Sequence, residues 1–176
     1  MARRNTLQYM ILGLLTRKEM TGYDIKQTFD KEKAEFWSAP FSQIYPELNR
    51  MLTSSLIELA PKENENSRKK AYQISDIGQK YFRHWLYLPL SSETVILNND
   101  DLILRLHFLG EKQKDQINQL LEIRIRTLKM EVSQLELELA EVINYPEQLG
   151  RKLIIEKELA NKKVDIKLWN KENRQQ

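Results

Sequence analysis

A heptad pattern in the second half of the chain constrains the fold more than any other feature. Its apolar members are separated alternately by four and three residues, and charged residues stand between them. This spacing places the members along one face of a long helix, which cannot bury that face without a helical partner. The members are Leu121, Ile125, Leu128, Val132, Leu135, Leu139 and Val142.

Tyr145-Pro146 interrupts this pattern, and the apolar residues that follow predict a second long helix. We expect helices over residues 99–109, 112–144 and 147–171. The last two would form an antiparallel hairpin, and the apolar surface that the hairpin leaves uncovered predicts a homodimer. The residues expected at the dimer interface are Leu121, Ile125, Leu128, Val132, Leu135, Leu139, Leu153, Leu159 and Trp169.

The first half of the chain predicts a separate unit that begins with two short helices. Apolar residues recur at helical spacing from Leu7 to Leu15, and Asn5 or Thr6 would be the N-cap. The second helix would begin at Thr21-Gly-Tyr-Asp24, which is similar to a capping box with Asp in place of Glu. Gly22, in its first turn, would allow close packing against the first helix.

A third helix is expected within residues 38–55, and its faces differ in chemistry. Ile44, Leu48 and Met51 share an apolar face. Hydroxyl and amide groups on the other faces can meet phosphate oxygens and base edges, so this segment predicts a recognition helix that enters DNA. The residues that fall away from the apolar face are Ser42, Gln43, Glu47, Asn49 and Arg50.

Two short strands joined by the polar residues 62–67 predict a β-hairpin after the third helix. Ser75 would cap a fourth helix, so the order of elements is that of a winged helix–turn–helix, with the hairpin tip as the wing. Basic residues of the wing would meet DNA; the alternative is a solvated run of charge. The basic residues are Arg68, Lys69 and Lys70, and the apolar side predicted for the fourth helix carries Ile77, Tyr81, Phe82, Trp85 and Leu86.

Charge and composition narrow the function classes. The first 85 residues hold 14 Lys and Arg against 10 Asp and Glu, a mild basic excess that suits a polyanion. The absence of cysteine excludes disulfides, thiol nucleophiles and cysteine-ligated zinc, and it fits a cytoplasmic protein. We find no glycine-rich phosphate loop, catalytic motif, clustered histidines or run long enough to span a membrane. We therefore expect no enzyme activity, no cofactor, no metal site and no membrane partner.

Four motifs resemble the PadR family of bacterial transcriptional regulators and occur in the family's order. One departure is Ser55-Leu56, where the family usually has a glycine. The lead-in Phe36-Trp-Ser-Ala39 is similar to the branch that represses phenolic acid decarboxylase genes. The motifs are Ile11-Leu-Gly-Leu-Leu15, Thr21-Gly-Tyr-Asp24, Ser42-Gln-Ile-Tyr-Pro-Glu-Leu48 and Lys70-Ala-Tyr-Gln-Ile-Ser-Asp-Ile-Gly78.

The resemblance implies a mainly α-helical protein with a small β-hairpin. A winged helix–turn–helix domain would cover residues 1–88, a linker 89–97 and a helical dimerisation domain 98–176. Such a protein would be a dimeric repressor that binds a palindromic operator in double-stranded DNA through the third helix and the wing. The residues expected to bind DNA are Ser42, Gln43, Tyr45, Lys26, Arg50, Arg68, Lys69, Lys70, Arg3 and Arg4. For Tyr45 the alternative is a packed aromatic ring with an exposed hydroxyl, and for Arg3 and Arg4 it is solvation.

The resemblance also implies release from DNA by a small aromatic acid, bound between the two domains. Candidate lining residues are Trp85, Arg105, His107, Phe108 and Met130, although aromatic residues at helical spacing are more often core. A rival hypothesis is a helical protein–protein interaction module whose winged helix does not bind DNA.

Overall fold

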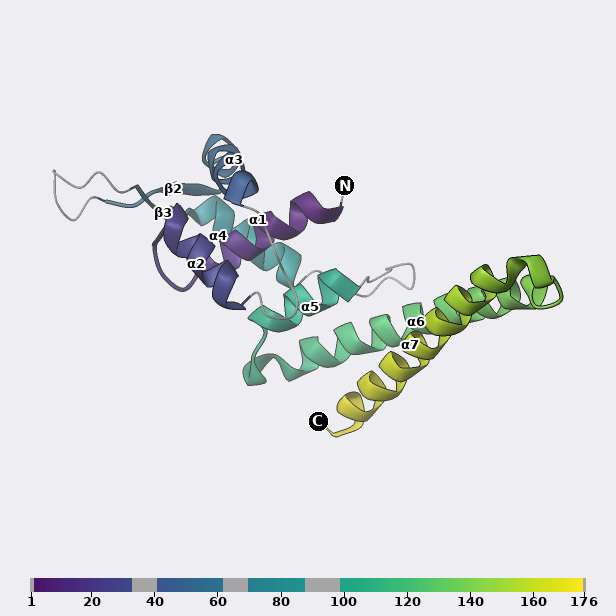
Figure 1. Ribbon diagram of the computed structural model, residues 1–176. Helices are drawn as coiled ribbons and strands as arrows, with labels where there is room; N and C mark the ends of the chain where they lie inside the picture. Colours follow the sequence, from purple (N-terminus) through teal and green to yellow (C-terminus); the bar gives the residue numbers. More distant parts are fainter. Residues whose placement is uncertain (1, 33–40, 62–69, 88–98, 176) are drawn as a thin grey trace. The chain divides into compact units, whose positions relative to one another are not determined.

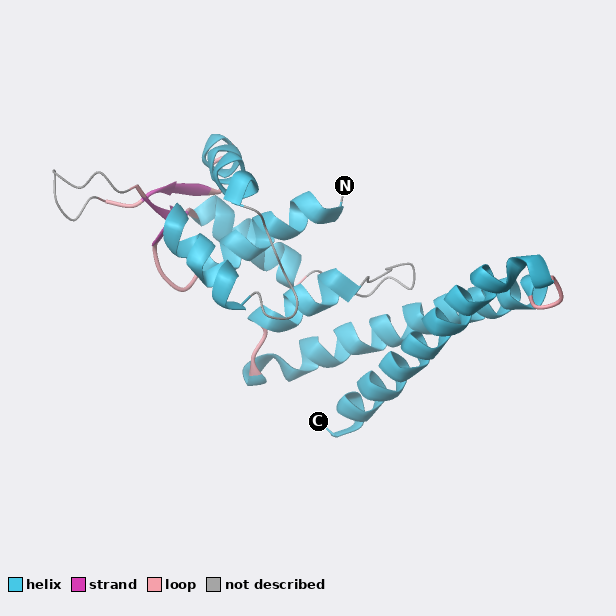
Figure 2. Ribbon diagram, in the orientation of Figure 1, coloured by secondary structure: helices cyan, strands magenta, loops and turns pink. Residues whose placement is uncertain are grey.

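The computed structural model describes residues 2–32, 41–61, 70–87 and 99–175, which belong to two compact units. One unit comprises Met1–Leu88 and Ile103–Phe108, and the other comprises Pro89–Leu102 and Leu109–Gln176. Helices dominate both, and the first unit also contains a small antiparallel sheet (Figure 2). The predicted fold class is therefore confirmed. The predicted linker at 89–97 lies outside the described residues, so that domain division stays a prediction.

The first unit is built around α1 (Ala2–Leu15), α2 (Gly22–Glu32), α3 (Phe41–Thr53) and α4 (Asp76–Leu86), with the end of α5 (Asn99–Phe108) beside them (Figure 1). The predicted apolar faces of α1 and α3 are buried and form the core with α2. The buried residues from these three helices include Leu7, Met10, Ile11, Leu14, Leu15, Ile25, Phe29, Ile44, Leu48 and Met51.

The start of α1 differs from the prediction. The helix begins at Ala2, so Asn5 and Thr6 lie inside it and neither is its N-cap. Ala and Arg are good helix formers, and the preceding Ala2-Arg-Arg4 therefore extends the helix by about one turn.

The sheet contains β1 (Met20–Thr21), β2 (Ile57–Leu59) and β3 (Ala71–Ile74) in the order β1-β3-β2. Strands β2 and β3 are the predicted hairpin, with Ile57 opposite Ile74. Strand β1 was not predicted, because two residues are too few to show an alternating pattern. The hairpin tip at 62–69 lies outside the described residues.

The capping box at the start of α2 is confirmed. The Asp24 carboxylate accepts from the Thr21 backbone N–H at 2.9 Å, and the Asp24 N–H donates to Thr21 Oγ1 at 3.1 Å. A Cβ at Gly22 would lie 2.8 Å from the Tyr45 ring, so this glycine allows a close approach to α3. Its expected packing against α1 stays a prediction.

The start of α4 also follows the prediction, because Ser75 Oγ accepts from the Gly78 N–H at 2.9 Å. Phe82, Trp85 and Leu86 are buried, as expected. Ile77 and Tyr81, expected on the same side, are 58% and 40% exposed. Gly78 itself packs against backbone, since a Cβ at this position would lie 1.9 Å from the Leu56 carbonyl oxygen.

Helix α3 ends in a tight turn that carries the departure from the family pattern. Leu56 N–H donates to the Met51 carbonyl at 2.9 Å and Ser55 N–H to the Leu52 carbonyl at 3.0 Å, the two bonds of a Schellman motif. Ser55 occupies the left-handed position of this motif with φ 57°. Glycine is the usual residue at this position because it adopts a positive φ without strain. The glycine that the family usually has here would therefore form the same turn.

The second unit consists mainly of α6 (Lys114–Val142) and α7 (Leu149–Gln175), which run antiparallel beside each other (Figure 1). They correspond to the helices predicted over 112–144 and 147–171, and a short 3-10 turn, Pro146–Gln148, joins them. Salt bridges connect the two helices, for example Lys163 to Glu136 at 2.8 Å. No helix in the described parts of the chain combines the length and apolar character needed to cross a membrane.

Candidate nucleic-acid interface

Helix α3 presents a polar face on the side opposite its core residues. Ile44, Leu48 and Met51 are 0% exposed, which fixes the rotation of the helix about its axis. At about 100° per residue, Ser42 and Asn49 then lie nearly opposite the buried face, and both are exposed. Gln43, which was predicted to contact DNA with Ser42, is also exposed. The amide of Asn49 therefore joins the two predicted candidates on this surface.

One edge of α3 adjoins the start of α2 and the strand β3. The Tyr45 ring lies over Gly22, as expected for a packed aromatic ring, and the residue is 42% exposed; its contact with DNA stays a prediction. Tyr45 and Lys70 line a hollow of about 610 Å³. Burial, assisted by the nearby Tyr45, raises the pKa of the Tyr72 hydroxyl above its ordinary value. The hollow is lined by Thr21, Gly22, Tyr23, Asp24, Tyr45, Asn49, Lys70 and Tyr72.

The other edge of α3 contacts α1 through a charged pair. Arg50 Nε donates to Glu47 Oε2 at 3.0 Å, and Nη2 donates to Glu47 Oε1 at 2.5 Å. Nη2 also reaches the amide oxygen of Gln8 at 3.3 Å. Glu47 was expected on a polar face but is only 5% exposed. Its hydrogen bonds are the main reason that the pKa of Arg50 is raised above its ordinary value.

The structure describes the remaining residues predicted to bind DNA to different extents. Lys26 lies on α2 and forms a salt bridge with Asp30 one turn later. Arg68 and Lys69 lie outside the described residues, although Lys70 beside them is exposed. Arg3 and Arg4 belong to the first turn of α1, and only their backbone is described.

Trp85, Arg105 and Phe108, three of the residues predicted to bind an effector, belong to an aromatic cluster in the first unit. The Trp85 ring stacks on Tyr9 with centroids 4.2 Å apart, and the Arg105 guanidinium carbon lies 4.8 Å from the centroid of the Trp85 ring. Arg105 also donates to the Trp85 carbonyl at 2.5 Å and is only 5% exposed. This packing matches the alternative reading of the aromatic residues as core.

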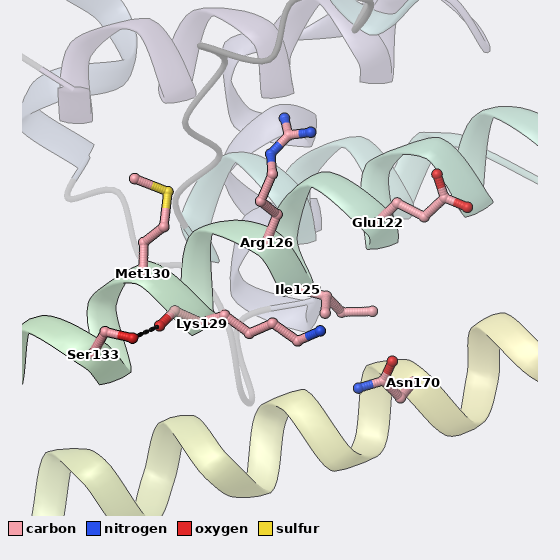
Figure 3. Close-up of a pocket in the computed structure, with 7 residues that line it drawn as sticks. All are labelled: Glu122, Ile125, Arg126, Lys129, Met130, Ser133 and Asn170. Atoms are coloured by element: carbon pink, nitrogen blue, oxygen red, sulfur yellow. Dashed lines mark hydrogen bonds between the residues drawn. The ribbon is translucent and has the colours of Figure 1, made fainter. Parts of the chain in front are cut away.

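His107 and Met130 are placed differently from that cluster's buried members. His107 is exposed, and its ring meets Phe108 edge to face at 4.8 Å. Met130 is 62% exposed on α6 in the second unit. It lines a surface hollow of about 410 Å³ between α6 and α7, where Lys129 extends toward Asn170 (Figure 3). That all five predicted residues form one effector site stays a prediction.

The residues predicted for dimerisation divide into two groups. Leu121, Ile125 and Leu128 are buried within the single chain, and Val132, Leu135 and Leu139 pack against a core that includes Leu159. The later part of the α6 pattern is therefore matched by α7 of the same chain. Leu153, by contrast, is 56% exposed. Other apolar residues of the hairpin, which were not predicted at the interface, are also at least 45% exposed: Met130, Leu137, Leu149, Ile154, Val164 and Leu168. Trp169 is partly buried.

The described residues contain no cluster of three or more His, Asp or Glu side chains that could hold a metal ion. The chemistry available at α3 is instead that of hydroxyl, amide and guanidinium groups at a convex surface. Such groups donate and accept hydrogen bonds and carry positive charge, which suits recognition of a phosphate backbone and base edges.

Sequence comparisons identify relatives with the same motifs. Residues 11–84 match the family model described as "Transcriptional regulator PadR-like family". A negative transcriptional regulator, PadR, from Bacillus subtilis is 32% identical over 133 residues, covering 74% of this chain and 71% of the relative. A probable transcriptional regulator from Mycobacterium tuberculosis is 31% identical over 86 residues, covering 48% of this chain and 46% of the relative.

Comparison with solved structures finds B. subtilis PadR in complex with operator DNA, at 26% identity and a TM-score of 0.43, covering 96% of this chain and 98% of that chain. The same protein in complex with p-coumaric acid matches at 25% identity and a TM-score of 0.43, covering 97% and 98%. The sequence match to the B. subtilis regulator extends over more than two thirds of both proteins. The chain belongs to the PadR-like family of transcriptional regulators.

Proposed function

We propose that this protein is a dimeric repressor that binds a palindromic operator through α3 and the wing. The observation that carries the proposal is the exposed polar face of α3, with Ser42, Gln43 and Asn49 set above a fully buried apolar face. Gln and Asn amides can each form two hydrogen bonds with adenine in the major groove. The negative direction of regulation follows the description of the B. subtilis relative.

The two edges of α3 would supply contacts to the DNA backbone. Tyr45 and Lys70 both line the hollow beside α2, and Arg50 lies at the opposite edge of α3. The wing residues Arg68 and Lys69 and the α1 residues Arg3 and Arg4 would add charge, as would Lys26 if it exchanged Asp30 for phosphate. Contacts of this kind fix the position of a protein on DNA, whereas the amides read sequence.

Dimerisation would bury the apolar residues that one chain leaves exposed on α6 and α7. Leu153 and Ile154 are 56% and 65% exposed on α7, and Leu137 is 65% exposed on α6. Two recognition helices held about 34–36 Å apart could read successive major grooves of a palindrome. We infer that the second unit sets this separation, and that a small aromatic acid such as a phenolic acid changes it. Such a regulator would act in the cytoplasm, without enzyme activity.

The test is binding of the full-length protein to duplex from the promoter of its own gene and of the neighbouring genes, compared with scrambled duplex. We expect tighter binding to one promoter duplex at physiological salt, and weaker binding when phenolic acids are added. Gln43→Ala should cost roughly 1–3 kcal/mol on that duplex and less on scrambled DNA. Equal affinity for promoter and scrambled duplexes would contradict the proposal and favour a protein–protein interaction module.

A further inference from the structure

The Glu47–Arg50 pair at one edge of α3 suggests a role for Glu47, which is not among the residues predicted to bind DNA. Glu47 and Arg50 are one turn apart on α3, but their environments differ: the Glu47 side chain is 6% exposed and that of Arg50 is 47% exposed. The carboxylate is therefore enclosed by protein, while the guanidinium faces solvent. A surface salt bridge of the usual kind would leave both groups in water and contribute little.

The geometry of the pair fixes the guanidinium plane. Two parallel hydrogen bonds from Nε and Nη2 to the Glu47 carboxylate form the fork arrangement that restricts an arginine most strongly. The amide oxygen of Gln8 accepts a further bond from Nη2 at 3.3 Å, and Gln8 is itself buried on α1. Glu47 and Gln8 thus hold the edge of the guanidinium that carries Nε and Nη2.

One end of the guanidinium stays available in this arrangement. An arginine carries five N–H donors, and the bonds that Glu47 and Gln8 accept use Nε and Nη2. Among the described residues none accepts from Nη1, so its two hydrogens can serve an acceptor outside the chain. Arg50 follows Gln43 by seven residues, which is close to two helical turns, so both residues lie on the same side of α3.

We propose that Glu47 is a positioning residue: together with Gln8 it holds Arg50 so that Nη1 meets a DNA phosphate beside the bases that Gln43 reads. The proposal rests on the proposed DNA-binding function. Under this proposal the buried Glu47 carboxylate strengthens the binding of a polyanion, although it is itself negatively charged. Charge alone predicts the opposite, since removing an acidic residue near DNA should strengthen binding.

The experiment measures affinity for the preferred promoter duplex as a function of salt, for wild type, Glu47→Gln, Arg50→Lys and the double variant. Glu47→Gln leaves one carboxamide oxygen where the guanidinium had two acceptors, so it releases Arg50 from its fixed position. Arg50→Lys removes the guanidinium and puts in its place an ammonium that cannot form the fork. We expect each single variant to bind about tenfold more weakly. The salt slope should fall by about one phosphate contact in each. The double variant should bind no more weakly than either single variant, because both changes remove one contact.

Glu19→Gln is the matched control, because Glu19 is an exposed acidic residue of the same unit. It should bind DNA at least as tightly as wild type. Thermal unfolding of every variant shows whether Glu47→Gln is folded; if it is not, Arg50→Lys decides, since Arg50 lies at the surface. Wild-type affinity and salt slope in Arg50→Lys would overturn the proposal.

The experiment distinguishes failure of the proposed function from failure of the positioning role. If wild type does not prefer a promoter duplex, the proposed function is wrong and the positioning role falls with it. If wild type prefers the duplex but Glu47→Gln behaves like Glu19→Gln, the function stands and the positioning role alone is wrong. Additive losses in the double variant would also contradict it, since they would place Glu47 and Arg50 in separate contacts.

Discussion

Gly78 offers a sharp test of the packing that joins α4 to the turn after α3. A Cβ at this position would lie 1.9 Å from the Leu56 carbonyl oxygen, 2.9 Å from its carbonyl carbon and 3.0 Å from Ile74 Cγ1. Carbon and oxygen atoms normally approach to about 3.3 Å. Gly78→Ala therefore requires backbone to move by more than an ångström, because neither a carbonyl nor the first turn of a helix can rotate aside.

The size of the effect follows from the contacts that such a movement would disturb. Overpacking typically costs about 1–3 kcal/mol. The Leu56 carbonyl also accepts from Ser75 N–H at 3.2 Å, and losing that hydrogen bond adds about 1 kcal/mol. Alanine is the better helix former by about 1 kcal/mol, which offsets part of the loss. The last two terms cancel, so we expect Gly78→Ala to lower the free energy of unfolding by about 1–3 kcal/mol.

The measurement is urea unfolding followed by circular dichroism and tryptophan fluorescence, since Trp85 lies buried in the same unit. Gly150→Ala is the matched control, because a Cβ at Gly150 in α7 meets nothing within 4 Å. The control should unfold at the wild-type urea concentration or slightly above it. If Gly78→Ala and Gly150→Ala unfold together, the close approach of α4 to Leu56 is wrong.

Two further predictions concern the end of α3 and the apolar surface of the second unit. Ser55→Gly should raise the free energy of unfolding by about 0.5–1 kcal/mol in urea titrations, because Ser55 has φ 57° and glycine adopts this conformation without strain; an unchanged or lower midpoint would contradict this reading of the turn. Leu153→Glu, at a side chain that is 56% exposed, should give monomers in sedimentation at micromolar concentration while circular dichroism still shows the wild-type helix content; the thermal unfolding temperature should fall, because the dimer no longer stabilises the folded chain. An unchanged dimer mass would exclude Leu153 from the interface.

Local patterns in the sequence predicted much of this fold. The capping box at Thr21 and Asp24, the N-cap at Ser75 and the apolar face of α3 each depend on residues within one or two turns of one another. Such features are determined by helix geometry, whatever the rest of the chain does. The heptad pattern likewise predicted the long helix α6, although much of its apolar face is covered within the single chain.

Features that depend on distant residues could not be predicted in the same way. Glu47 is buried, and its partner Arg50 also donates to Gln8 of α1, which lies 42 positions away in the sequence. The strand β1 exists because β3 passes beside Met20 and Thr21, and two residues carry no pattern of their own. Gly22 packs against Tyr45 for a similar reason. Each outcome depends on where a neighbouring element lies, which periodicity does not specify.

These distant contacts share one consequence for the recognition helix. Its buried face sets its rotation, but, under the proposed function, sliding along its axis or tilting would still change which bases its amides would reach. Tyr45 against Gly22 restrains one edge, and the Glu47–Arg50 pair with Gln8 restrains the other. Both restraints involve side chains that also reach solvent, so the groups that orient α3 adjoin the groups available to DNA. A change at either edge should therefore alter affinity for DNA more than it alters the stability of the fold.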